Sequence, residues 1–226
     1  MRERTTLNAA IILVAGALLT IVVPAATPMA EAQDTPKEVY EPAQALPAEA
    51  YAAKAGAAYA IGMLAYIWGY PLMDMYRLRD YYTAGPRPGG LNSPINQFTH
   101  ARVLMDDKYT GGQYPNIDTL HSSVWLDLAK EPQILHIPDT KGRYYLVPLV
   151  SAYNEIFAII GARTKGYGAK TYAIVGPNWK GVLPKDVEEV RSPTNVVWVF
   201  IRNLISGPEE LDAVHTLQNG YTIQPL

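Results

Sequence analysis

Residues 48–70 form the first long stretch in which apolar residues recur every three or four positions, the spacing of one face of an α-helix. The opposite side is also apolar, because it carries Ile61 and Trp68. A helix that is apolar nearly all round is either sandwiched between layers or used in an interface. We therefore predict a helix over residues 48–70 that Pro71 ends or kinks. Its uncharged part, Ala55–Gly69, is too short to span a bilayer.

The pattern then changes to the two-residue alternation of β-strands. In VWLDL, Val124, Leu126 and Leu128 point to one side and Trp125 to the other. Further runs rich in β-branched and aromatic residues, separated by turn residues, are RYYLVPLVSA, EIFAIIGART, KTYAIVGP and NVVWVFIRNLI. Short strands at this spacing predict an antiparallel sandwich or barrel over about residues 95–205.

A second helix is predicted near the C-terminal end, over about residues 207–219. Pro208 suits its first turn, and the two glutamates that follow lie at the positive end of the helix dipole. Leu211 and Val214 belong to its buried face, and Gly220 is a natural stop. The predicted class is mainly β with added helices. Because the run VVWVFI is apolar on both faces, we expect the first helix to cover one sheet.

The segment 1–32 has the features of a secretory signal peptide: two arginines precede an apolar run that ends at the small-residue site Ala30-Glu31-Ala32. We expect cleavage after Ala32 and a periplasmic or secreted protein. The alternative is an uncleaved segment that anchors the chain in a membrane, since the run approaches spanning length. Residues 33–47 lack an apolar period, which predicts a flexible lead-in before a domain over residues 48–226.

Composition excludes several classes of function. The net charge is −2 with no basic cluster, so the chain has no electrostatic footprint for nucleic acid. It has no cysteine, which rules out disulfides, thiol nucleophiles, zinc–thiolate sites and a lipid on cysteine. Common hydrolase, nucleotide-binding and metalloprotease motifs are absent as well. The sequence does not identify a cofactor. The remaining candidates for catalysis or binding are four histidines and polar loop residues.

The stretch YPNIDTLHSS, residues 114–123, concentrates polar groups just before an apolar run. Asn116 and Asp118 have short side chains that hydrogen-bond their own backbone, which predicts a capped turn that enters a strand. The alternative is a site in which Asp118 and Thr119 join His100 as oxygen and nitrogen ligands, although the spacing selects no metal.

The histidines allow structural and functional interpretations. His100, in NQFTHAR, could act as a general base or could satisfy a buried carbonyl. His121 should lie on the same strand face as Ser123 and Trp125. For the remaining two histidines, a packed or half-exposed structural role is favoured.

Three arginines lie in apolar or turn sequence, namely Arg102, Arg143 and Arg191. A guanidinium in such a place needs a carboxylate or carbonyl partner. We expect Arg143 to pair with Asp118 or Asp127. A pair of this kind holds loops together and can also orient an anionic ligand.

An ordered series of motifs resembles the bacterial family known as domain of unknown function 1254 (DUF1254). The motifs are NQFTHAR, YPNIDTLHSSVWLDL, IPDTKGRYYLVPL, VGPNWKG, RSPTN and AVHTLQNGY, and the resemblance extends from the helix end AYIWGYPL onward. It implies an exported protein with an Ig-like β-sandwich and helical additions, and it implies no established activity. Family members commonly continue into a second, jelly-roll-like region of the DUF1214 type, whereas this sequence ends at Leu226. The partners expected are therefore a DUF1214-type domain or chain, or a second copy.

The resemblance also carries over a set of candidate site residues of unknown role, namely Asn96, His100, Arg102, Asn116, Asp118, Thr119 and Arg143. Two functions are compatible with them. The favoured one is a noncatalytic binding or assembly module, which needs these residues to be paired with each other or with the backbone. The alternative is a periplasmic hydrolase with His100 as base and Asp118 or Arg143 as orienting partners, which needs them within hydrogen-bond reach of one another.

Overall fold

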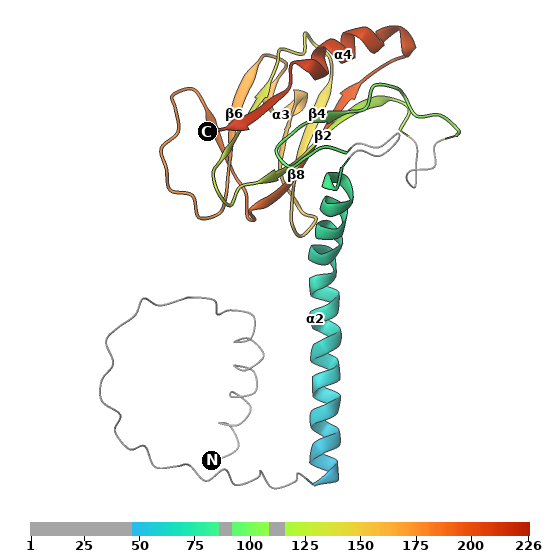
Figure 1. Cartoon of the computed structure of the whole chain (residues 1–226), viewed down its shortest axis with the longest axis vertical. Coiled ribbons are helices and arrows are strands. Elements are labelled where there is room, and N and C mark those ends of the chain that lie inside the picture. Colours follow the sequence, from blue (N-terminus) through green and yellow to red (C-terminus); the bar gives the residue numbers. More distant parts are fainter. Residues whose placement is uncertain (1–46, 86–91, 109–115) are drawn as a thin grey trace. The chain divides into compact units, whose positions relative to one another are not determined.

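The computed structural model describes residues 47–85, 92–108 and 116–226 (Figure 1). The predicted signal peptide, nearly all of the predicted lead-in, and the first two residues of YPNIDTLHSS lie outside these residues. The described residues from Ala48 to Leu226 form one compact unit. They are mainly β, with a long helix before the strands and a short helix after most of them, which confirms the predicted class.

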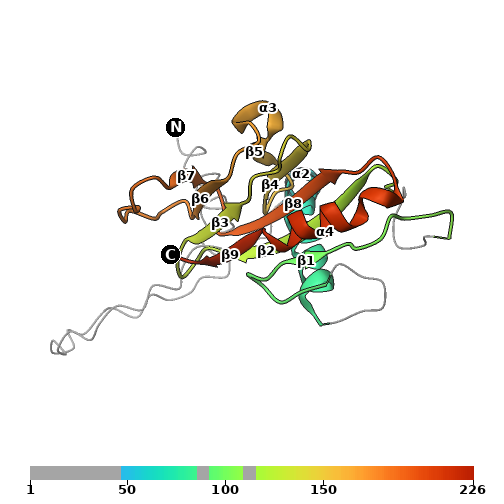
Figure 2. The same cartoon turned by 90° about the horizontal axis from the view of Figure 1, so that it is seen from above.

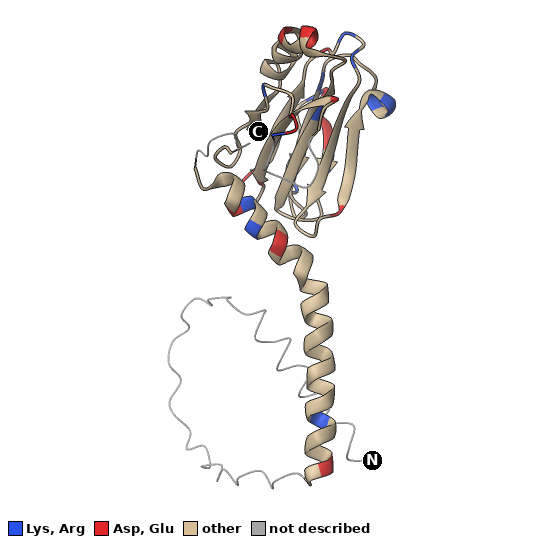
Figure 3. Cartoon of the chain, turned by 90° about the vertical axis from the view of Figure 1, so that its right-hand side faces the viewer, with Lys and Arg blue, Asp and Glu red and all other residues tan. Residues whose placement is uncertain are grey.

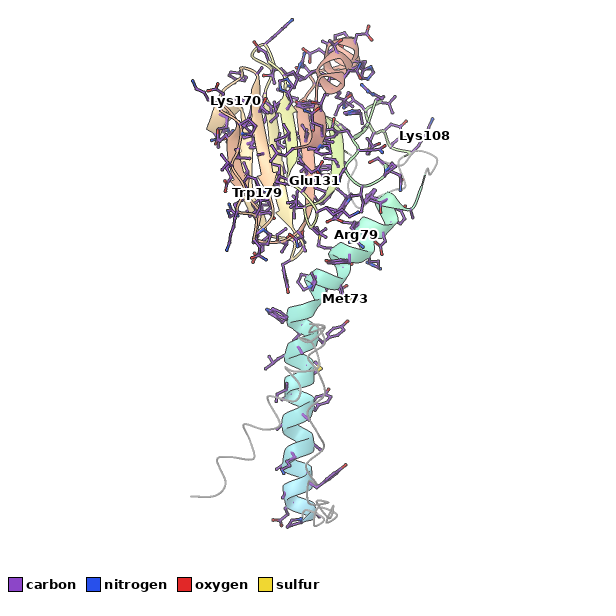
Figure 4. All side chains as sticks on the ribbon, turned by 60° about the vertical axis from the view of Figure 1, so that its left-hand side comes forward. Met73, Arg79, Lys108, Glu131, Lys170 and Trp179 are labelled. Atoms are coloured by element: carbon purple, nitrogen blue, oxygen red, sulfur yellow. The ribbon has the colours of Figure 1, made fainter. Side chains whose placement is uncertain are left out.

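The first helix, α2, spans Ala48–Thr83, so the prediction that it ends at Pro71 is wrong. Proline in a helix interior removes one hydrogen bond and its ring displaces a carbonyl, at a cost of about 3 kcal/mol. The helix continues because its last turns are packed against the sheet, where Met75 is 3% exposed and Leu72 and Leu78 pack around it. Figure 4 shows that the ribbon changes direction close to Met73, as expected after proline.

Among the described residues, nine strands make two sheets that face each other as a sandwich (Figure 2). The larger sheet has the order β1 (Thr99–His100), β2 (Thr119–Asp127), β8 (Val196–Leu204), β4 (Tyr145–Ser151) and β5 (Ile156–Gly161). The smaller sheet has the order β7 (Glu188–Arg191), β6 (Lys170–Val175), β3 (Gln133–Ile137) and β9 (Thr222–Pro225). All the described pairs are antiparallel except β6 with β7, which is parallel, so the second sheet is mixed.

The core between the sheets follows the alternation read from the sequence. Val124 and Leu126 of β2 point into it with Val199 of β8, and Leu135 of β3 and Tyr172 of β6 point into it from the other sheet. Of these five side chains none is more than 1% exposed. Burial on this scale supplies the main stabilisation of a domain that has no disulfide.

The outer face of the larger sheet carries a second apolar cluster. Trp125 of β2 and Trp198 of β8 stack with their ring centroids 5.4 Å apart, and Val150 of β4 lies beside them. The last turns of α2 cover this cluster through Met75 and Leu72. As expected, the first helix covers one sheet, but only the C-terminal third of α2 does so.

The C-terminal helix was predicted with nearly correct bounds. A 3₁₀ turn, η1 (Pro208–Glu210), leads into α4 (Leu211–Asn219), which buries Val214 and ends before Gly220. The strand pattern did not reveal β9, which follows this helix and adds to the edge of β3. It also missed α3 (Ala162–Lys165), a single turn at the end of a predicted strand.

Candidate functional site

Asn116, Thr119 and His121 form a hydrogen-bonded group that we call the polar corner. The Asn116 side-chain oxygen accepts the backbone N–H groups of Asp118 at 3.2 Å and Thr119 at 2.9 Å. This is the backbone-capping turn that the sequence predicted for PNID. The turn sets the chain at the start of β2, and Asp118 itself is at the surface.

The same asparagine also fixes the imidazole of His121. Its amide nitrogen lies 2.7 Å from the Thr119 hydroxyl and 2.6 Å from Nε2 of His121, so its two N–H groups can serve one acceptor each. An accepting Nε2 requires a neutral ring with its proton on Nδ1. Burial, and secondarily the charge of Arg202, lower the pKa of His121 from 6.5 to about 4, while Asp118 acts in the opposite direction. His121 is therefore neutral and held in one tautomer at neutral pH.

His121 lies on the outer face of the larger sheet, as the alternation predicted. Its ring centroid is 4.5 Å from that of Phe200, which is 5.0 Å from Trp198. The indole N–H of Trp198 donates to the Ser123 hydroxyl at 2.8 Å. Only 8% of His121 is exposed, so little of the ring is open to a ligand from solvent.

His100 lies on a different strand and faces a different side. Its Nδ1 is 2.7 Å from the hydroxyl of Ser122, and its ring stacks on Phe98 at 5.7 Å. Ser122 and His121 are successive residues of β2, so their side chains lie on opposite faces of the sheet. Burial, and then the charge of Arg102, lower the pKa of His100 to about 4. A base with so low a pKa is a weak proton acceptor at neutral pH.

The structure does not bring His100 and Asp118 together. His100 pairs across the ladder with Ser122, which is four residues beyond Asp118. Four residues of strand span about 13 Å, beyond the reach of one bridging water. The two central residues of the hydrolase hypothesis are therefore far apart.

Arg102 holds the end of α4. Its guanidinium donates to the His215 carbonyl and the Gln218 side chain, each at 3.2 Å, and to the Asn219 side chain at 2.6 Å. In return, Nε2 of His215 lies 2.7 Å from the Arg102 carbonyl. A cation at the negative end of a helix dipole is in a favourable place. The contacts of Arg102 thus join the segment just after β1 to α4.

The expected pairing of Arg143 with Asp118 or Asp127 is wrong. Arg143 donates to the Leu204 carbonyl and to the Glu210 carboxylate, both at 2.8 Å. Glu210 also accepts the N–H of Ser206 at 2.8 Å. The Arg143 hydrogen bond, followed by the Ser206 bond, lowers the pKa of the Glu210 carboxyl. The sequence did not show this partner because 67 residues separate the two.

Asn96 connects the segment before β1 to the end of β2. It has a positive φ of 61°, which asparagine tolerates better than most residues. Its backbone N–H donates to the Trp125 carbonyl at 2.8 Å, and its side-chain oxygen accepts the N–H of Asp127 at 3.0 Å.

Gln218 has a role that the sequence analysis missed. It is fully buried, and its amide nitrogen donates to the carbonyls of Ala101 and His121 at 3.0 Å each. Its side-chain oxygen accepts from Arg102. In the sequence, Gln218 was noticed only as part of the motif AVHTLQNGY. The spacing of residues in that motif does not indicate a buried amide.

Two surface hollows are lined by other residues. One, of about 370 Å³, is lined by His136, Ala169, Lys170, Thr171, Asp186 and Glu188. The other, of about 320 Å³, is lined by residues 144–146, Ile159 and residues 161–164. Neither hollow contains any of the seven candidate residues. Within the described ranges, no three His, Asp or Glu side chains are grouped so as to hold a metal ion.

These observations define a class of protein: a two-sheet sandwich module with an apolar helix before it, in which the candidate polar side chains other than that of Asp118 make contacts within the chain. The chain belongs to the family described as "Protein of unknown function (DUF1254)", whose model matches residues 95–225. The match begins after α2, so it covers the sandwich and α4. It therefore starts later in the chain than AYIWGYPL, where the resemblance was expected to begin.

Two solved structures are similar to this chain. The VPA0106 protein from Vibrio parahaemolyticus has 27% sequence identity and a TM-score of 0.58, over 72% of this chain and 37% of that chain. An uncharacterized protein from Burkholderia cenocepacia has 14% identity and a TM-score of 0.36, over 58% of this chain and 36% of that chain. This chain thus aligns with well under half of the length of each. No curated protein matches it.

Proposed function

We propose that this protein is an exported, noncatalytic binding or assembly module that docks to its partner through the exposed part of α2, residues 51–70. One observation carries the proposal. Trp68 is 70% exposed, Leu64 67% and Tyr59 73%. The other large apolar side chains exposed on the segment are Tyr51, Ile61, Met63, Tyr66, Ile67 and Tyr70.

An apolar surface of this extent is unusual for a protein that works alone. Contiguous apolar patches beyond a few hundred Å² mark interaction sites. No charged residue interrupts the segment between Lys54 and Asp74, as Figure 3 shows. None of the described helices is long and apolar enough to cross a membrane. A protein partner is therefore the favoured cover for this surface.

The alanines of this segment favour a helix, but its three glycines and its aromatic residues do not. Gly56, Gly62 and Gly69 each weaken an exposed helix by roughly 0.5–1 kcal/mol relative to alanine. Tyr, Trp and Ile are only moderate helix formers, and most helical stability in proteins comes from packing. Docking would add burial that stabilises the helix over residues 51–70.

The candidate residues support the noncatalytic half of the proposal. These residues form three groups that share no hydrogen bond: the polar corner, the contacts of Arg102 and the contacts of Arg143. In each group the hydrogen bonds are made to backbone or side-chain groups of the chain itself. A hydrolase would need them to converge on a concave pocket. Export rests on the signal-peptide pattern of residues 1–32.

The test is site-specific photo-crosslinking in cells of the source organism. Benzoylphenylalanine replaces Trp68 in one strain and Val182, which is 91% exposed and lies on the sandwich, in another. A discrete adduct from position 68 that is absent from position 182 is the expected result. No adduct at position 68, or equal adducts at both positions, would refute docking through α2.

A further inference from the structure

We propose that the hollow of about 320 Å³ beside α3 binds an amphipathic organic anion, with the apolar body of the ligand in the hollow and its carboxylate on Arg163. This site lies on the sandwich, so the inference goes beyond the docking surface on α2 and does not depend on it. Three observations lead to it: an apolar hollow that no residue of α2 lines, an arginine at its rim without a carboxylate partner, and a second such arginine on the same sheet face.

The hollow lies on the outer face of the larger sheet, at the β5 edge. Leu146 of β4 pairs with Gly161 of β5, and Ile159 lies two residues before Gly161 on the same face. Ile160, between them, points into the core. The residues of α3 follow Gly161 directly and supply the remaining wall (Figure 2). The last turns of α2 pack on Val150 instead, four residues further along β4.

Gly161 keeps the floor of the hollow open. A Cβ atom at this position would lie 2.8 Å from the carbonyl oxygen of Tyr145 and 3.3 Å from Cα of Leu146, so a side chain would push β5 away from β4. The volume is near the lower end of the range of about 300–1,000 Å³ that small-molecule sites occupy. The hollow therefore suits a short aliphatic chain or a single ring rather than a large cofactor.

Arg163 is the cation at the rim. Its guanidinium carbon lies 5.7 Å from the ring centroid of Tyr144, which also lines the hollow. Among the described residues, no carboxylate lies within ion-pair distance of Arg163, and none lines the hollow. Lys165, the other cation of α3, differs because it is paired with Glu188. The donors of Arg163 are therefore available to an anionic group.

Arg202 places a second positive charge on the same face of the sheet. It pairs with Leu146 across the β8–β4 ladder, so Leu146 lies between Arg202 and Gly161. Two strand spacings, about 10 Å, separate the backbones of Arg202 and Gly161. The guanidinium carbon of Arg202 lies 5.1 Å from the ring centroid of Phe200, and no carboxylate of the described part of the chain pairs with it. Two such charges on one face attract an anion.

The ligand needs both an apolar body and a negative charge. An ion pair in contact with water is weak and is screened by salt, so a small anion would gain little from Arg163 alone. A neutral apolar molecule of this size would bury too little surface to offset the entropy lost on binding. An amphipathic anion gains from both contacts at once, which is why the hollow and the arginine together indicate this chemical class.

The test is isothermal titration calorimetry of the purified protein with three probes. Octanoate has an apolar chain and a carboxylate, octanamide has the same number of carbons without the charge, and acetate has the charge without the chain. We expect octanoate to bind at least about tenfold more tightly than either of the other two. Equal affinity for acetate or for octanamide, or no binding of octanoate up to about 5 mM, would overturn the inference.

Two pairs of variants locate the site. Arg163→Gln removes the charge at the rim, and Lys180→Gln, at an exposed cation between β6 and β7, is its control. Ile159→Ala removes part of a wall, and Ile156→Ala is its control, since Ile156 is 58% exposed on the same strand and does not line the hollow.

We expect octanoate binding to weaken at least about fivefold for the arginine variant and about threefold for the variant at position 159, and less than about twofold for the controls. All four side chains are exposed, so the fold should be retained, and urea unfolding checks this. Losses of equal size in the controls would place octanoate elsewhere and contradict the inference. None of these outcomes bears on docking through α2.

Discussion

The amide nitrogen of Asn116 lies 2.6 Å from Nε2 of His121. This contact links a turn in front of β2 to a buried ring on the outer face of the sheet, and it determines which nitrogen of the imidazole carries the proton. The residues that suggested a site in the sequence therefore have a structural use, which is to fix the entry into β2.

Asn116→Ala should destabilise the protein by about 2 kcal/mol, because it removes two hydrogen bonds to backbone N–H groups and leaves Nε2 of His121 without its donor. Equilibrium denaturation in urea measures the change. Asp118→Asn is the matched control, since Asp118 is exposed and contributes its backbone to the turn. Its effect should stay within about 0.5 kcal/mol. Equal losses for both variants would contradict the assigned role of Asn116.

Stability should fall as the pH is lowered from 6.5 towards 4. Both His100 and His121 have a folded pKa of about 4 against 6.5 unfolded, so the unfolded state binds more protons in this window. The two histidines contribute their full stabilisation of the folded state above pH 6.5, and this stabilisation is lost as the pH falls towards 4. Partial solvent screening limits it to about 1–2 kcal/mol for each histidine.

The check is urea denaturation of the wild type and of His100→Gln/His121→Gln at several pH values. Carboxylates titrate in both proteins, so the difference between the two curves isolates the histidines. The wild type should lose more stability than the variant between pH 6.5 and 4.5. Parallel curves would show that the histidines have ordinary pKa values.

Loss of the hydroxyl group should have different effects on the free energy of unfolding at two buried tyrosines. The Tyr172 hydroxyl is buried without a hydrogen-bond partner among the described residues, so Tyr172→Phe should be neutral or stabilising by up to about 1 kcal/mol. Tyr221 donates to the Asn203 side chain at 2.6 Å, so Tyr221→Phe should cost about 1–2 kcal/mol. Thermal and urea unfolding measure both, and a reversed order would contradict the hydrogen-bond assignment.

Arg102→Lys should weaken the attachment of α4. A lysine cannot reproduce the fork that serves three acceptors on the last turn of the helix, so we expect a loss of about 1–2 kcal/mol. Amide hydrogen exchange should show faster opening of α4 while the strands of the larger sheet stay protected. Unchanged exchange in α4 would mean that its apolar face alone holds it.

Local patterns predicted the elements whose side chains alternate or recur regularly. Val124, Leu126 and Leu128 lie in the core as their alternation indicated, and Gly220 follows α4. The helix beyond Pro71 could not be foreseen, because its continuation depends on packing against Trp125, a residue far away in sequence. The parallel β7 has no apolar alternation to mark it, since Glu188, Glu189 and Arg191 make up most of it.

The same distinction between local contacts and contacts far apart in sequence applies to the candidate site. The Asx turn at Asn116 was predictable because its partners are two and three residues away. Contacts of the arginines were not, because Glu210 and Asn219 approach Arg143 and Arg102 only through the fold. A sequence shows that a buried guanidinium needs a partner, but several carboxylates and carbonyls satisfy that need equally well.

Hydrogen exchange along α2 tests the central claim most directly. In a cell extract that contains the partner, a docked segment predicts that backbone amides of residues 56–70 exchange at least about tenfold more slowly than in the purified protein alone. A helix that docks to nothing would exchange at the same rate in the extract and in the purified protein, although residues 72–82 stay protected against the sheet. That result would contradict the account.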